Sequence, residues 1–155
     1  MNAESLLVKI ASAINKSRLE AVMIGNAGAA LHGAPVTTLD IDFMFRHTSA
    51  NLKKLKVIAD TLNAYILKPY YPMSGLYRII NEDIGLQLDF MSAVHGINSF
   101  ESLRSRAINI DFNGNNILVA DLEDIIISKR SAARPRDIAV IEILEAALYE
   151  KRTKR

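Results

Sequence analysis

Three aspartates are the residues of this sequence whose types and spacing best suit chemistry. Asp40 and Asp42 stand two residues apart in a run over 39–46 where carboxylate and apolar residues alternate. Because alternate residues of a strand point to the same face, this spacing places two anions in one small volume. Asp89 lies in a second alternating run, 87–91, and joins them if its strand lies beside the first.

Carboxylates held this close repel one another, and they are stable as anions only if a cation neutralises them. Hard oxygen ligands select Mg²⁺ or Mn²⁺. The chain has no cysteine, which excludes a disulfide framework and a thiolate zinc site and is compatible with the cytoplasmic location that we expect. The pattern therefore predicts a magnesium or manganese site at Asp40, Asp42 and Asp89.

A glycine turn precedes the paired aspartates. Gly25, Asn26, Ala27 and Gly28 follow an apolar run over 21–24 and begin a segment of small residues. Free backbone N–H groups at the start of a helix can bind a phosphate, so the turn and the carboxylates together indicate a metal–phosphate site. Short motifs also match by accident, so a structural protein with solvent-facing aspartates is an alternative.

The residues from 22 to 43, VMIGNAGAALHGAPVTTLDIDF, resemble the signature of the polymerase-β-like nucleotidyltransferases, a glycine turn followed by paired aspartates and a later third one. The most similar subgroup is the AbiEii-like proteins, toxins of toxin–antitoxin and phage-abortive systems. Their C-terminal block is similar to Lys129, Arg134 and Asp137 here. The resemblance spans about residues 20–148.

This resemblance implies a transferase that moves a nucleoside monophosphate from a nucleoside triphosphate to a hydroxyl of RNA or protein, with an antitoxin as a partner. Asp40 and Asp42 would hold two divalent ions, and Asp89 would complete the acceptor-side metal site and assist deprotonation of the hydroxyl. The nucleotide-binding residues it implies are Gly25, Asn26, Thr38, Lys129 and Arg134.

Two positions depart from the family pattern. Asn26 stands where the family has Gly or Ser, and Val36 stands where many members have Arg. Asn tolerates left-handed backbone angles and can donate a hydrogen bond, so phosphate contact survives in a modified form. The loss of the arginine leaves a second interpretation open, a non-catalytic binding module of the same fold or the antitoxin half of a pair.

Other polar residues carry weaker signals. His32 and His95 each lack a carboxylate at a spacing that would orient them, which favours packing roles. Tyr77 also fits packing, whereas Tyr70 and Tyr71 could stack a base. The cations between residues 129 and 136 fit either a solvated helix end or contact with triphosphate or RNA backbone.

Length and composition predict one globular domain over residues 1–150. The chain has 155 residues, 50% hydrophobic and 23% charged, as folded domains do. Of its 19 basic residues, four form a terminal run, Lys151, Arg152, Lys154 and Arg155. Without that run the chain has 15 basic and 17 acidic residues. We expect 151–155 to be a disordered tail. The uncharged stretch 21–39 is too rich in glycine and polar residues to span a membrane, so no membrane partner is expected.

Periodicity and turn residues predict an α/β (α+β) fold of the nucleotidyltransferase type, a mixed sheet flanked by helices and ending in C-terminal helices. Asn113 and Gly114 mark a hairpin. Asp121 can cap a helix, and Pro135 suits the first turn of the last one. The expected helices are 4–17, a short one after Gly25, 48–63, one after Asp121 and one from Pro135; the expected strands are 21–24, 39–46, 64–67, 76–81, 86–92, 108–110 and 117–119.

Overall fold

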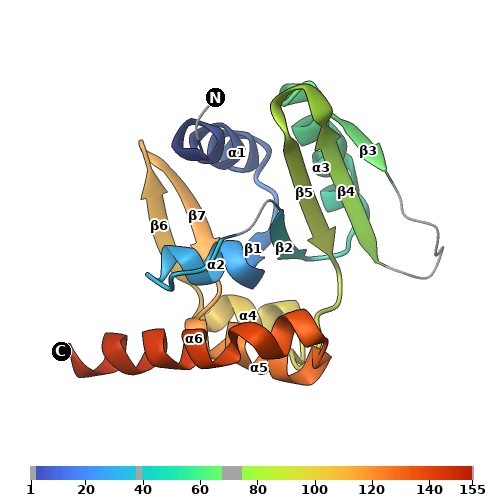
Figure 1. Ribbon diagram of the computed structural model, residues 1–155. Coiled ribbons are helices and arrows are strands. Elements are labelled where there is room, and N and C mark those ends of the chain that lie inside the picture. The colour runs from blue at the N-terminus through green and yellow to red at the C-terminus, as the bar shows by residue number, and fades with distance from the viewer. Residues whose placement is uncertain (1–2, 38–39, 68–74, 155) are drawn as a thin grey trace.

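The structure is a computed structural model that describes residues 3–37, 40–67 and 75–154. Its centre is one seven-stranded sheet in the order β3-β4-β5-β2-β1-β7-β6 (Figure 1). The pairs β2–β5 and β1–β7 are parallel and the others antiparallel, which confirms the predicted mixed sheet. The strands are β1 Ala21–Ile24, β2 Ile41–Phe45, β3 Tyr65–Leu67, β4 Leu76–Asn81, β5 Leu86–Met91, β6 Ile108–Phe112 and β7 Asn115–Val119.

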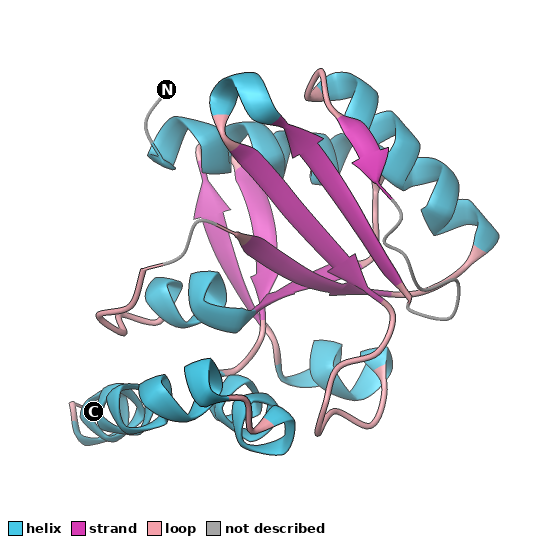
Figure 2. Cartoon of the chain, turned by 45° about the vertical axis from the view of Figure 1, so that its right-hand side comes forward, coloured by secondary structure: helices cyan, strands magenta, loops and turns pink. Residues whose placement is uncertain are grey.

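Helices cover both faces of the sheet (Figure 2). The apolar residues of α1 and α3 pack with Phe43 and Phe45 of β2 in one core, and those of α4, α5 and α6 pack with Met44 in the other. The alternation predicted for this strand is therefore confirmed. The helices are α1 Ala3–Ser17, α2 Gly25–Leu31, α3 Ser49–Thr61, α4 Phe100–Arg106, α5 Leu122–Ala132 and α6 Pro135–Thr153, with a short 3₁₀ turn at Glu82–Ile84.

The helix starts agree with the sequence in part. Thr48 caps α3, because its side chain accepts a hydrogen bond from the Asn51 backbone at 3.1 Å. Pro135 lies in the first turn of α6, as expected. Asp121 is at the N-cap of α5, but its side chain makes no capping hydrogen bond with the described residues. The short helix α4 was not predicted.

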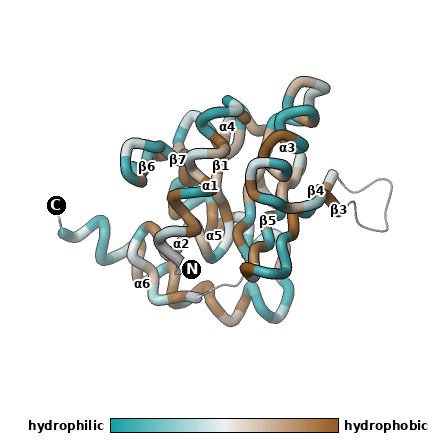
Figure 3. Tube along the Cα trace, turned by 90° about the horizontal axis from the view of Figure 1, so that it is seen from above, coloured by the Kyte–Doolittle hydropathy of each residue, from teal (hydrophilic) through white to brown (hydrophobic). Residues whose placement is uncertain are grey.

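The C-terminal end differs from the expected disordered tail. Helix α6 continues to Thr153, and its hydrophilic last turns project beyond the rest of the fold (Figure 3). Lys151 contacts Nδ1 of His32, and Arg152 donates to Glu123 at 2.9 Å. Basic side chains at a helix C-terminus also interact favourably with the helix dipole. Among the described residues no helix is both long and apolar enough to cross a membrane.

Candidate active site

A cleft of about 680 Å³ opens at the end of the central strands where β1 ends and β2 begins. It is bounded by β4, β5 and the loop after β5, and by the facing parts of α5 and α6. Seven of the eight site residues expected from the sequence line this cleft; Thr38, the eighth, lies outside the described residues, as do Tyr70 and Tyr71. The seven are Gly25, Asn26, Asp40, Asp42, Asp89, Lys129 and Arg134.

Strand pairing brings the three aspartates together. Asp42 and Asp89 are directly opposite each other on the parallel strands β2 and β5. Asp40 stands one residue before β2 and lines the same cleft. The condition set by the sequence, that the strand of Asp89 lie beside that of Asp42, is therefore met.

The environment of Asp42 disfavours its charge. Burial, together with repulsion from Asp89 and Asp40, raises the pKa of Asp42 to about 6, and the nearby Lys129 and Arg134 offset only part of this. A carboxylate in this condition gains from an added cation, because the cation favours the charged form. A positive ligand next to Asp42 would therefore be favoured.

Gly25 brings backbone next to this carboxylate. Its φ is +67°, and a Cβ at this position would lie 3.0 Å from Oδ2 of Asp42. Glycine is required here for two reasons, the left-handed backbone and the close approach. The next residue, Asn26, has a buried Oδ1 that accepts no hydrogen bond from the described part of the chain.

The cations predicted to bind nucleotide are held by a buried aspartate. Arg134 donates to Asp137 through Nε at 2.6 Å and through Nη2 at 3.1 Å, and Lys129 Nζ lies 3.8 Å from the same carboxylate. Burial alone would raise the pKa of Asp137, but the hydrogen bonds and charge of Arg134 outweigh it and lower the pKa. Burial lowers the pKa of Lys129. Both cations thus line the cleft beside Asp137, which is hydrogen-bonded to Arg134 and forms an ion pair with Lys129.

The sequence did not point to Arg78 as a site residue. From β4 it donates to Asp89 through Nε to Oδ1 at 2.8 Å and through Nη2 to Oδ2 at 3.1 Å. The two residues are direct partners in the antiparallel β4–β5 pair. The sequence did contain a signal for it. The expected strands 76–81 and 86–92 are separated by a short segment with Asp83 and Gly85, and a short hairpin loop sets the register that places Arg78 opposite Asp89.

The two histidines considered in the sequence, His32 and His95, differ in position. His32 does not line the cleft: its Nε2 lies 2.7 Å from the Ala120 carbonyl oxygen and its Nδ1 faces Lys151. Burial lowers the pKa of His32, which suits the neutral ring that donates at Nε2 and accepts at Nδ1. His95 lines the cleft from the loop after β5 and is exposed. Tyr77 packs edge-on against Phe45, as expected.

The carboxylates of the cleft could hold a divalent ion only with help from other ligands. Among the described residues no group of three or more metal-ligating side chains lies close enough to hold one. Mg²⁺, however, is commonly bound by one or two carboxylates together with substrate phosphates. Asp40 and Asp42 supply two carboxylate groups as hard oxygen ligands, and burial together with the neighbouring carboxylates raises the pKa of Asp42 in spite of Lys129 and Arg134. These residues therefore fit an ion that arrives with a nucleotide.

Solved structures with the same architecture identify the fold. The chain is similar to ANT(2")-Ia in complex with adenylyl-2"-tobramycin, at 16% identity and a TM-score of 0.64 over 97% of this chain and 92% of that one. It is also similar to the lincosamide antibiotic adenylyltransferase LnuA, at 13% identity and 0.64 over 95% and 98%. A nucleotidyltransferase-like protein from Paracoccidioides brasiliensis follows at 14% identity and 0.51 over 98% and 88%.

These likenesses define the class, an α/β protein with the nucleotidyltransferase fold. Within that class, the chain belongs to the family described as "Nucleotidyltransferase of unknown function (DUF6036)", whose model matches residues 5–151. No curated protein sequence is significantly similar to it.

Proposed function

We propose that the protein transfers a nucleoside monophosphate from a nucleoside triphosphate to a hydroxyl acceptor. One observation carries this proposal: the register of β1, β2 and β5 places Gly25, Asp42 and Asp89 around one cleft, opposite Lys129 and Arg134. The aspartates would bind a divalent ion, and the lysine and arginine across the cleft would bind phosphate groups. Together they suit a ligand that contains both a divalent ion and a triphosphate. Membership of a nucleotidyltransferase family supports the same reaction class.

The roles follow from the positions of the residues. Asp40 and Asp42 would hold the ion where β2 begins, and the backbone of Gly25, which lies close to Asp42, would contact a phosphate there. Lys129 and Arg134, fixed by Asp137, would contact phosphate oxygens from the opposite wall. When bound, the ion supplies positive charge for the phosphate oxygens and the pyrophosphate leaving group.

The transfer exchanges one bond for another. The acceptor oxygen forms a bond to the α-phosphorus, and the bond from that phosphorus to the oxygen bridging to the β-phosphate breaks. The hydroxyl proton leaves the acceptor, and pyrophosphate departs with the electron pair of the broken bond. The protein forms no covalent bond, so its contribution is positioning and electrostatic stabilisation.

A labelling experiment tests the proposal. The protein is incubated with each of the four α-³²P nucleoside triphosphates, Mg²⁺ and a cell extract, and labelled RNA, protein and small molecules are separated. We expect label in one of these fractions, and none with Asp40→Asn or Asp42→Asn variants whose circular dichroism matches that of the wild type. No label with any nucleotide, together with no metal-dependent nucleotide binding, would contradict an enzyme and leave a non-catalytic module.

The labelled fraction also decides between narrower forms of the proposal. RNA or protein carrying the label would support a toxin of the AbiEii type acting in the cytoplasm, and would justify a search for a cognate antitoxin. Two of the structural relatives have names or bound molecules that concern antibiotics, so tobramycin and lincomycin belong in the acceptor panel.

A further inference from the structure

Asp89 is held by an arginine of the adjacent strand β4. Both of its oxygens accept hydrogen bonds from one guanidinium, that of Arg78, at 2.8 and 3.1 Å. Asp89 is buried, with 6% of its surface exposed, and the two residues pair directly across β4 and β5. A bidentate pair of this kind sets the plane of the carboxylate as well as compensating its charge.

The neighbouring Asp42 has a different environment. It accepts no hydrogen bond from an arginine or lysine among the described residues, and its charge is opposed by burial and by two other carboxylates. The cleft thus contains one carboxylate that has cations near it but no hydrogen bond from a described arginine or lysine and, directly beside it, one that is hydrogen-bonded to a guanidinium of the sheet. Two such carboxylates have different uses.

On the basis of the proposed function, we infer that Arg78 is a positioning residue. It prevents Asp89 from acting as a metal ligand and orients the Asp89 carboxylate to accept the proton of the acceptor hydroxyl. Asp40 and Asp42, with phosphate oxygens, hold the ion. This assignment replaces the third-ligand role that the sequence predicts for Asp89. The proton moves from the acceptor oxygen to a carboxylate oxygen of Asp89 as that oxygen bonds to the α-phosphorus and pyrophosphate leaves.

Electrostatics opposes a metal-ligand role for Asp89. A carboxylate has about four lone-pair positions, of which Arg78 occupies two, so Asp89 retains capacity to accept further hydrogen bonds. A divalent ion placed there would be repelled by the guanidinium that holds the carboxylate. A neutral hydroxyl donating a hydrogen bond incurs no such repulsion.

Metal binding provides a test that does not depend on activity. Mn²⁺ affinity, alone and with a non-hydrolysable nucleotide analogue, is measured by electron paramagnetic resonance. The key variant combines Arg78→Gln with Asp89→Asn, because it removes both members of the pair and leaves the net charge of the cleft unchanged. We expect its Mn²⁺ affinity to stay within about threefold of the wild type. Asp42→Asn should lose at least about tenfold, the smaller of the losses seen even for outer contacts of a metal site.

Transfer kinetics provide the second test. With the acceptor found by labelling, Arg78→Lys and Arg78→Gln should lower kcat by about 10–100-fold and leave KM for the nucleotide unchanged, with the lysine variant the less affected. Arg106 supplies the matched control: it holds the buried Asp124 with the same 2.8 and 3.1 Å contacts but does not line the cleft. Arg106→Lys and Arg106→Gln should leave kcat unchanged.

The outcomes separate the two proposals. A double variant that loses Mn²⁺ as Asp42→Asn does, or Arg78 variants with wild-type kcat, would overturn the inference and leave the transferase intact. Arg106 variants that lower kcat as much as the Arg78 variants would also overturn it, since the effect would then be general loss of structure. A wild-type protein that binds neither Mn²⁺ nor nucleotide would instead contradict the proposed function.

Discussion

At the scale of single residues, two neighbouring carboxylates of the cleft differ in how their negative charge is compensated. Asp89 is compensated by Arg78, which belongs to the next strand. Asp42 has no equivalent partner among the described residues, and its pKa is raised to about 6. A charge that is not fully compensated destabilises the ligand-free protein, and a bound cation would remove this cost. At Asp42 the requirements of stability and of ligand binding therefore conflict.

Asp42→Asn should stabilise the metal-free protein at high pH. Because the folded-state pKa lies above the unfolded value of 3.8, stability is full below about pH 4 and falls as pH rises towards 6. The variant removes this loss and should be more stable than the wild type by about 1–3 kcal/mol at about pH 8, with no difference near pH 4. Urea unfolding in EDTA at both pH values checks this, and a variant less stable at pH 8 would contradict the raised pKa.

Gly25→Ala should impair both folding and ligand binding, and Gly85→Ala only the first. Both glycines have φ of +67°, so each substitution costs about 1–2 kcal/mol of backbone strain. The new Cβ at Gly85 would meet no atom of the described residues within 4 Å, whereas at Gly25 it would lie 3.0 Å from Oδ2 of Asp42. Thermal unfolding and Mn²⁺ titration of the two variants separate strain from displacement of the carboxylate. Equal Mn²⁺ affinity in both would show that the close approach has no role.

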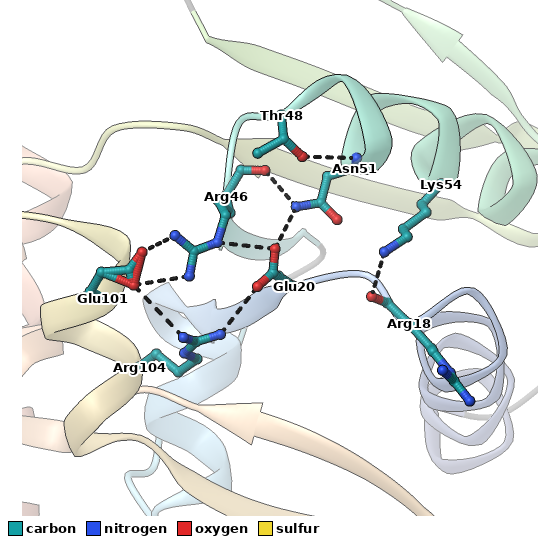
Figure 4. A network of polar contacts seen from close by, with 8 residues as sticks. All are labelled: Arg18, Glu20, Arg46, Thr48, Asn51, Lys54, Glu101 and Arg104. Carbon is teal, nitrogen blue, oxygen red and sulfur yellow. Dashed lines mark hydrogen bonds and ion pairs between the residues drawn. The ribbon is translucent and has the colours of Figure 1, made fainter.

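At the scale of elements, a polar network lies at the other ends of β1 and β2, away from the cleft. Figure 4 shows its residues. Glu20, just before β1, accepts hydrogen bonds from Arg46 at 3.0 Å and from Asn51 at 3.1 Å. Arg104 of α4 also donates to Glu20, and Arg46 and Arg104 both pair with Glu101. The network therefore ties the start of β1 and the end of β2 to α3 and α4.

Asn51→Ala should weaken the fold without affecting the cleft. Asn51 is 1% exposed, and its amide donates to Glu20 and, at 2.8 Å, to the Arg46 carbonyl oxygen. Loss of these bonds should lower the free energy of unfolding by about 2 kcal/mol. Thr61→Ala, at an exposed position of the same helix, should change it by less than about 0.5 kcal/mol. Chemical denaturation measures both, and Mn²⁺ affinity should match the wild type in each.

Most elements could be predicted because their signals are local. The alternation in β2, the glycine turn after β1 and the Asn113–Gly114 hairpin are properties of a few neighbouring residues. Helix α4 escaped prediction because it has only seven residues and buries Phe100 and Leu103 alone, too little for a periodic pattern. Its cap, Ser99, which accepts from the Ser102 backbone at 3.0 Å, was the available signal.

At the scale of the whole molecule, the candidate ligand would join parts of the fold that meet only at the cleft. The carboxylates belong to the central strands, and the cations to α5 and the start of α6. A ligand that bridges the two walls binds the folded chain and not the unfolded one, so it raises stability by mass action.

Mg²⁺ with a non-hydrolysable nucleoside triphosphate should therefore raise the melting temperature. At a concentration about 100 times the Kd the gain is about 2.7 kcal/mol, which corresponds to about 5–10 °C for a chain of this size. Differential scanning fluorimetry measures the shift, and EDTA should remove it. Asp42→Asn should show no shift, whereas a shift that survives EDTA would argue against a metal-dependent nucleotide site.

The sequence by itself determined the features that depend on backbone geometry over a few residues. Asp40 and Asp42 share a face because strands alternate, and Gly25 marks a turn because only glycine readily takes that conformation. Only the tertiary structure decided which charges of different elements become partners: Asp89 with Arg78, and Asp137 with Lys129. Strand register and helix packing set these pairs, and they determine which carboxylate is hydrogen-bonded to a cation of the fold and which, like Asp42, is only partly compensated.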